Sequence, residues 1–110
     1  MASDQDFVEF VIEQIHIPAT LTYKKMFGEY CIYADEKPFA FVCDNRLLVK
    51  PTDEGKAFAG KYLQEGQPYP GAKNYILVEE KLEDWQWLSQ LVKITIEVLP
   101  LPKPKKKKQK

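Results

Sequence analysis

Few side chains in this chain of 110 residues are of the types that carry out acid–base or nucleophilic chemistry. Its single histidine, His16, would have to serve in any histidine-based dyad or triad. Because His16 follows an expected helix, we interpret it as a helix-end residue, favourable there when protonated. Adjacent carboxylates occur at expected turns or helix starts, as Asp35-Glu36, Asp53-Glu54, Glu79-Glu80 and Glu83-Asp84. Solvation explains such pairs, so we expect no catalytic residue, no metal site and no cofactor.

The chain has two thiols, Cys31 and Cys43, which fall in neighbouring expected strands. Whether they meet depends on the hairpin between them. A loop with an odd number of residues puts both on the same face, and a pairing centred on Lys37 would set them opposite each other. A loop with an even number puts them on opposite faces, because side chains alternate along a strand. We interpret both as small buried hydrophobic residues, with a redox pair as the alternative.

Basic residues near aromatic ones form the main candidate for a binding surface. Arg46 and Lys50 share one face of an expected strand, and Lys24 or Lys25 would join them if the first strand lies nearby. The aromatic residues that would adjoin them are Tyr23, Phe27 and Tyr30. Basic groups with aromatic rings can bind single-stranded nucleic acid. The alternative is a solvated sheet face whose charges pair across strands.

The segment Pro68-Tyr69-Pro70-Gly71 predicts a stiff loop that carries one large aromatic ring. Such a loop either presents Tyr69 to a partner or tucks the ring over the core, and the sequence leaves both open. We therefore include Tyr69 among the candidate binding residues.

Three short apolar runs, at 30–34, 39–43 and 47–49, are separated by polar residues. Runs of this length, rich in aromatic and β-branched residues, predict an antiparallel meander. Further strands are expected at 21–27 and 75–78, which gives a mostly antiparallel sheet of four to five strands.

Three helices are expected to pack on this sheet. Apolar residues recur at helical spacing from 7 to 15, and Pro18 ends that N-terminal helix. Thr52 is a typical cap for a short middle helix, and Glu83-Asp84 begins a C-terminal helix in which Trp87 faces the core. The fold class that follows is α+β.

Charge is distributed unevenly along the chain. All sixteen acidic residues lie at or before Glu97, whereas six of the sixteen basic residues lie between Lys103 and Lys110. We expect a folded domain at 1–100, with a net charge of −6, and a disordered lysine-rich tail at 101–110. An acidic body argues against a nucleic-acid footprint on a folded face, although the tail can add weak, non-specific and salt-sensitive attraction.

The sequence also bears on where the protein acts. It has no run of the roughly 18 apolar residues that a membrane span requires. Its first ten residues are acidic and lack the basic start of a signal peptide. We therefore expect a cytoplasmic protein without membrane contact.

The chain resembles the N-terminal domain of the TfoX/Sxy competence regulators over about residues 5–100. The residues that carry the resemblance stand at 25–28, 32–33, 41–47, 49–52, 68–73 and 87–88. Two positions depart from the family pattern: Cys31 stands where a small, glycine-like residue is expected, and Glu36 stands where a hairpin glycine would be usual.

This resemblance implies a bacterial, non-enzymatic regulatory or adaptor domain that acts through protein–protein contacts. Members of the family act in transcriptional activation of competence genes together with the cyclic-AMP receptor protein. The expected partner is accordingly a protein, either the transcription machinery or a second copy of the chain in a homodimer. The alternative function is a nucleic-acid-binding accessory protein that uses the lysine tail and the face of Arg46 and Lys50.

Overall fold

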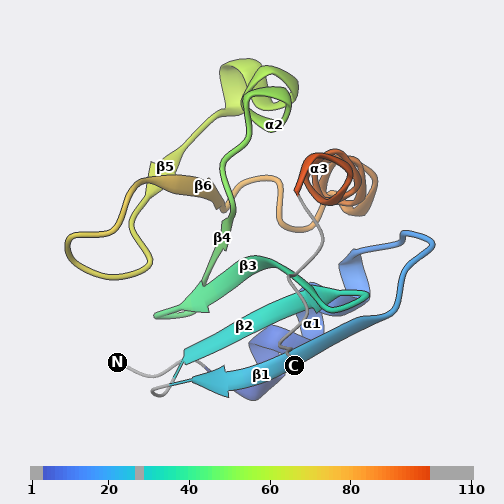
Figure 1. The fold of residues 1–110 in the computed structure, drawn as a ribbon, viewed down its shortest axis with the longest axis vertical. Coiled ribbons are helices and arrows are strands. Elements are labelled where there is room, and N and C mark those ends of the chain that lie inside the picture. The colour runs from blue at the N-terminus through green and yellow to red at the C-terminus, as the bar shows by residue number, and fades with distance from the viewer. Residues whose placement is uncertain (1–3, 27–28, 100–110) are drawn as a thin grey trace, which may run out of the picture.

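A single antiparallel sheet runs through the protein, and helices cover one of its faces (Figure 1). The computed structural model describes residues 4–26 and 29–99. The elements, in chain order, are α1 (Gln5–Gln14), β1 (Leu21–Met26), β2 (Glu29–Ala34), β3 (Lys37–Cys43), β4 (Arg46–Val49), α2 (Asp53–Ala59), the 3₁₀ turn η1 (Gly60–Tyr62), β5 (Glu65–Gly66), β6 (Tyr75–Val78) and α3 (Trp85–Val98). The expected α+β class and the three helices are confirmed.

The strands lie in the order β1-β2-β3-β4-β6-β5, and every neighbouring pair is antiparallel. The sheet thus has six strands, one more than the upper end of the expected range. The additional strand, β5, consists of Glu65 and Gly66, which pair with Ile76 and Tyr75. Two residues without an apolar side chain carry no strand pattern, so the sequence gives no signal for β5.

Two tight hairpins connect the meander. Asp35 and Glu36 join β2 to β3 with φ angles of 48° and 73°, and Asp44 and Asn45 join β3 to β4 with φ angles of 55° each. Positive φ at both central residues is what a type I′ turn requires. This turn twists in the same sense as the strands, which explains why two-residue loops suffice here.

A β-bulge in β3 decides how the two cysteines relate. Near the turn Tyr33 pairs with Pro38, but beyond Phe39 the register shifts, so that Ile32 pairs with Ala40. The two-residue loop alone would put Cys31 and Cys43 on opposite faces, and the extra residue brings them back to the same face. Cys31 therefore lies opposite Phe41, with Cys43 two residues further along β3.

The core lies between the sheet and the helices. Its strand residues share one face, which includes Ile32, Val42 and Leu47, and α1 and α3 contribute Val8, Val11, Leu88, Leu91 and Val92. All of these residues are fully buried. We call this the helix face, and the opposite face of the sheet the open face.

Side chains at the helix ends fix how the helices meet. The Thr52 hydroxyl caps α2 by accepting the Gly55 N–H (2.9 Å), and the Asp84 carboxylate caps α3 by accepting the Trp87 N–H (3.1 Å). Ser89 of α3 accepts the His16 N–H (2.7 Å) and donates to the carbonyl of Gln14 (3.2 Å). These contacts join the end of α1 to the start of α3.

No helix among the described residues is long and apolar enough to cross a membrane. Two predictions lie outside the described residues: the placement of Phe27 and the disordered tail at 101–110.

Candidate functional site

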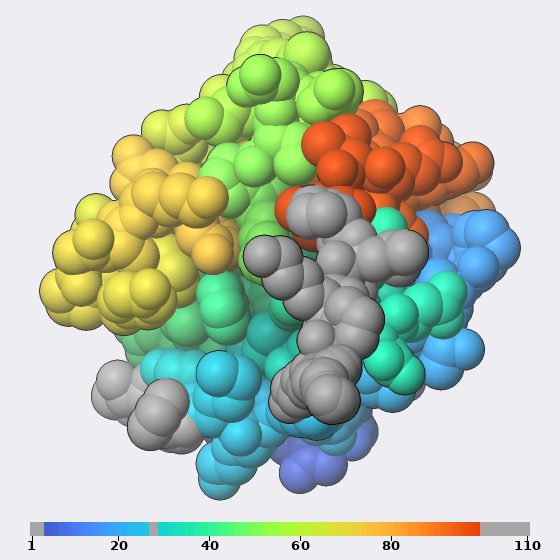
Figure 2. Space-filling view, in the orientation of Figure 1, coloured from blue at the N-terminus to red at the C-terminus, as the bar shows by residue number. Residues whose placement is uncertain are grey.

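A groove with a largely apolar lining lies on the open face of the sheet. It has a volume of about 700 Å³ and lies between the edge of the sheet and the loop that joins β5 to β6. We call it the Tyr69 groove, and its lining residues are Met26, Glu29, Tyr30, Phe41, Cys43, Pro68, Tyr69 and Pro70. Figure 2 shows the loop (yellow) protruding beside the blue-green surface of the meander.

A type II β-turn shapes the loop that walls the groove. The carbonyl of Tyr69 accepts the Ala72 N–H (3.1 Å), Pro70 and Gly71 are the central residues, and Gly71 has a φ of 87°. The Gln67 side-chain amide also donates to the Ala72 carbonyl (2.7 Å). Pro70 and these two hydrogen bonds restrict the loop, so Tyr69 is held in place while 62% of the residue's surface remains exposed. The loop therefore presents Tyr69 and does not tuck it over the core.

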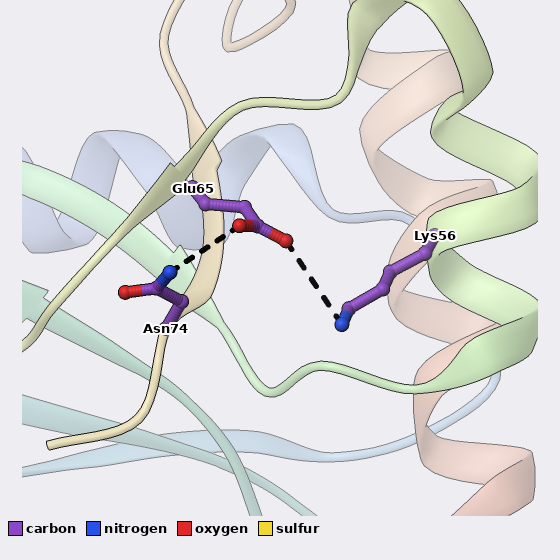
Figure 3. Close-up of polar contacts among 3 residues, drawn as sticks. All are labelled: Lys56, Glu65 and Asn74. Carbon is purple, nitrogen blue, oxygen red and sulfur yellow. Dashed lines mark hydrogen bonds and ion pairs between the residues drawn. The ribbon is translucent and has the colours of Figure 1, made fainter.

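The base of the loop is tied to α2 (Figure 3). Glu65, just before the loop, accepts a hydrogen bond from the Asn74 side chain (3.3 Å), just after it. The same carboxylate lies 3.9 Å from the Lys56 ammonium of α2. Both charged groups are exposed, so this contact aligns the hairpin while adding little to stability.

The floor of the groove is largely apolar and includes Cys43, one of the two thiols of the open face. Phe41 lies against Tyr75, with ring centroids 5.7 Å apart. Cys31 and Cys43 are both buried, and each is a free thiol that is not part of a disulfide. Burial, together with the nearby Glu29 carboxylate, raises the pKa of Cys43 to about 11, and burial likewise raises the pKa of Cys31. These thiols stay protonated at neutral pH, as expected for small buried hydrophobic residues.

Three of the predicted basic residues share the open face. Arg46 lies opposite Cys43 across β3 and β4, and Lys24 lies opposite Cys31 across β1 and β2. Lys50 lies near Cys31, and burial lowers the pKa of this lysine, with a further contribution from the charge of Lys73. The sequence left open a fully solvated sheet face. The open face is not of this kind, because Leu48, between Arg46 and Lys50, has no exposed surface.

The structure corrects two of the predicted surface residues. Lys25 pairs with Tyr30 on the helix face, so Lys24 joins Arg46 and Lys50 but Lys25 does not. Tyr30 is 7% exposed and belongs to the core, where its ring lies 5.6 Å from that of Tyr23, although it also borders the groove. Tyr23 faces α1, and its hydroxyl donates to Glu9 (3.1 Å). Because side chains alternate along β1, Lys24 lies on the open face, whereas Tyr23 and Lys25 lie on the helix face.

The other titratable groups that the structure describes lie at several separate places on the surface. His16 is exposed, and its ring lies against Trp85 with centroids 4.6 Å apart. Among residues 4–26 and 29–99, no group of three His, Cys, Asp or Glu side chains could hold a metal ion. A shallow hollow beside α1 carries Glu9 and Glu13, and another at the first hairpin carries Asp35 and Glu36.

Several groove residues were not among the sequence candidates. Met26, Phe41, Cys43, Pro68 and Pro70 line it but were assigned to strands, core or loop. Phe41 carries a usable signal, because it alternates with core residues in β3 and so must lie on the other face. The approach of the loop to β3 comes from β5, which the sequence does not reveal.

Fold and groove define a small α+β domain whose sheet has one helix-covered face and one grooved face. A family model for the TfoX N-terminal domain matches residues 14–99, so the chain belongs to the TfoX N-terminal domain family. The chain is also similar to a protein of Spirochaeta aurantia described as an uncharacterized 12.7 kDa protein in the trpE 5′ region. The two are 42% identical over 100 residues, which are 91% of this chain and 86% of that protein.

Proposed function

We propose that this chain is a non-enzymatic regulatory or adaptor domain that acts in the cytoplasm by binding a protein partner in the Tyr69 groove. The observation that carries the proposal is the exposed ring of Tyr69, held by a hydrogen-bonded turn over an apolar groove. Tyrosine, with few rotatable bonds and a large apolar surface, is enriched where proteins bind one another. Family membership supports a regulatory role, because the resemblance to the competence regulators implies transcriptional activation.

A pull-down from native lysate tests the proposal. The bait is the full chain, compared with Tyr69→Ser and with the matched control Tyr62→Ser, which removes another exposed tyrosine ring, one that lies against Trp87 outside the groove. We expect one or more proteins to be retained by the full chain and by Tyr62→Ser but lost with Tyr69→Ser. Equal retention by all three baits would reject the groove as the binding site.

Nucleic-acid binding is the second candidate, and the position of Lys24, Arg46 and Lys50 on one face favours it. A salt titration of binding to single-stranded DNA, with and without residues 101–110, separates the two functions. Binding absent even at low salt removes this candidate. A steep salt dependence that vanishes with the tail indicates non-specific attraction by the lysines alone.

A further inference from the structure

Arg46 stands out among the charged side chains beside the groove. Its Nε atom is buried and has no hydrogen-bond partner among the described residues. A buried donor without a partner destabilises the folded state, and the cost is larger when the group is charged. Nε itself is closed to solvent, so a ligand reaches Arg46 only through the terminal guanidinium nitrogens, and the missing partner shows that no described residue binds Nε.

The position of Arg46 connects it to the Tyr69 groove. Arg46 lies directly opposite Cys43, a groove residue, on the same face of the sheet. Its guanidinium extends toward β5, because a Cβ atom at Gly66 would lie 3.8 Å from Nη1. Gly66 is two residues before Pro68, which also lines the groove. Arg46 is not itself a lining residue of the groove, but its guanidinium lies beside β5, just before the loop that walls the groove.

Arg46 forms no ion pair with an acidic side chain among residues 4–26 and 29–99. Glu29, the acidic residue of the groove lining, already accepts the backbone N–H of Asp44 (3.1 Å). Lys24 and Lys50 lie on the same face and add positive charge. Residues 1–100 carry a net charge of −6, so this positive open face contrasts with the rest of the body.

We propose that the Tyr69 groove binds an extended protein segment in which an aromatic or aliphatic side chain lies close to a carboxylate, and that Arg46 binds the carboxylate. The apolar side chain would sit among Phe41, Pro68 and Tyr69, while the fork of the guanidinium matches the two oxygens of an Asp or Glu. This inference rests on the proposed function and adds to it the chemistry of the partner.

An acidic peptide fits these observations better than a nucleic acid does. A nucleic acid needs several bases along its phosphate backbone, and the net negative charge of the body opposes a long polyanion. The single carboxylate of an acidic peptide needs one donor with two parallel N–H groups, such as the Arg46 guanidinium. The apolar side chain next to it in the peptide needs a hollow, such as the groove. The groove lining, which is largely apolar, satisfies the second need.

Binding of the full chain to synthetic peptides tests the inference. The peptides place Phe, Leu or Trp one to four positions from Asp or Glu, and matched peptides carry Asn or Gln in place of the acid. We expect the amide peptides to bind about tenfold more weakly, the size of effect typical of one charge-assisted hydrogen bond. Arg46→Met, which keeps the apolar stem, should abolish this difference. Lys93→Met, which removes an exposed charge of α3, should leave it intact.

Chemical shifts of the labelled protein locate the binding and also show that each variant is folded. Perturbed signals at Phe41, Cys43 and Tyr69 support the inference. Equal affinity for acid and amide peptides, or perturbations on the helix face, would overturn it. Competition for the groove by oligo-dT, or occupation of the groove by a second copy of the chain, would also overturn it. If the acid preference fails while Tyr69→Ser still loses its captured partner, the proposed function survives without this inference.

Discussion

At the scale of single residues, strand alternation is the main physical rule behind the candidate site. It places Arg46 and Lys50 on one face, as the sequence predicts, and it separates Lys24 from Lys25. Choosing between Lys24 and Lys25 requires the pairing register of β1, which the sequence alone does not provide. The burial of Tyr30 likewise follows from pairing with Val42 on the helix face. Tyr69 is the predicted residue whose exposure most favours a binding role.

Replacing Cys43 by alanine should change how stability depends on pH. The folded-state pKa of Cys43 is about 11, above the ordinary value of 9.0, mainly because of burial. A raised thiol pKa contributes stability that is present below pH 9 and is lost as the pH rises toward 11. Above pH 9 the free energy of unfolding should therefore fall more steeply for the native chain, by at most about 1.4 kcal/mol per pH unit.

Urea unfolding at pH 8, 9, 10 and 11 measures this effect. The cavity left by Cys43→Ala lowers stability at every pH, so the informative quantity is the slope and not the absolute value. Identical slopes for the two proteins would show that the thiol is not shielded as the structure indicates.

At the scale of elements, turns and bulges decide which faces meet. The apolar runs predict the three meander strands and the strand at 75–78 because each has enough β-forming residues to bury a face. The bulge at Phe39 has no comparable sequence signal, and it reverses the face on which Cys43 would otherwise lie. The length of the hairpin loop alone therefore could not predict that Cys31 and Cys43 lie on the same face of the sheet.

The first hairpin should gain stability from Glu36→Gly. Glu36 has a φ of 73°, in the left-handed region that side chains with a Cβ atom disfavour. Glycine removes that cost but adds entropy to the unfolded chain, so we expect a net gain of up to about 1 kcal/mol. Thermal or urea unfolding measures it.

Glu36→Gln is the matched control, because it removes the charge and keeps the backbone strain. It should leave stability close to that of the native chain. A glycine variant no more stable than the glutamine variant would mean that the turn does not hold Glu36 in a left-handed conformation.

At the scale of the whole molecule, the sequence predicts the fold class and the family but not the site. Three helices and a meander follow from periodicity, and the family follows from the apolar motif around Phe41–Leu47, with the match at 14–99 confirming it. The groove arises between segments far apart in the chain: the end of β1, the middle of the meander and the loop after β5. Such long-range contacts depend on strand order, which local patterns do not encode.

The most direct test of the central claim is site-specific photo-crosslinking in cells. A photoreactive phenylalanine analogue replaces Tyr69 in one variant of the chain and Tyr62 in another, so that both report from exposed tyrosine positions. If the groove binds a protein partner, position 69 yields a discrete crosslinked protein adduct, and position 62 does not. Equal adducts at both positions, or crosslinks from position 69 to nucleic acid alone, would contradict the account.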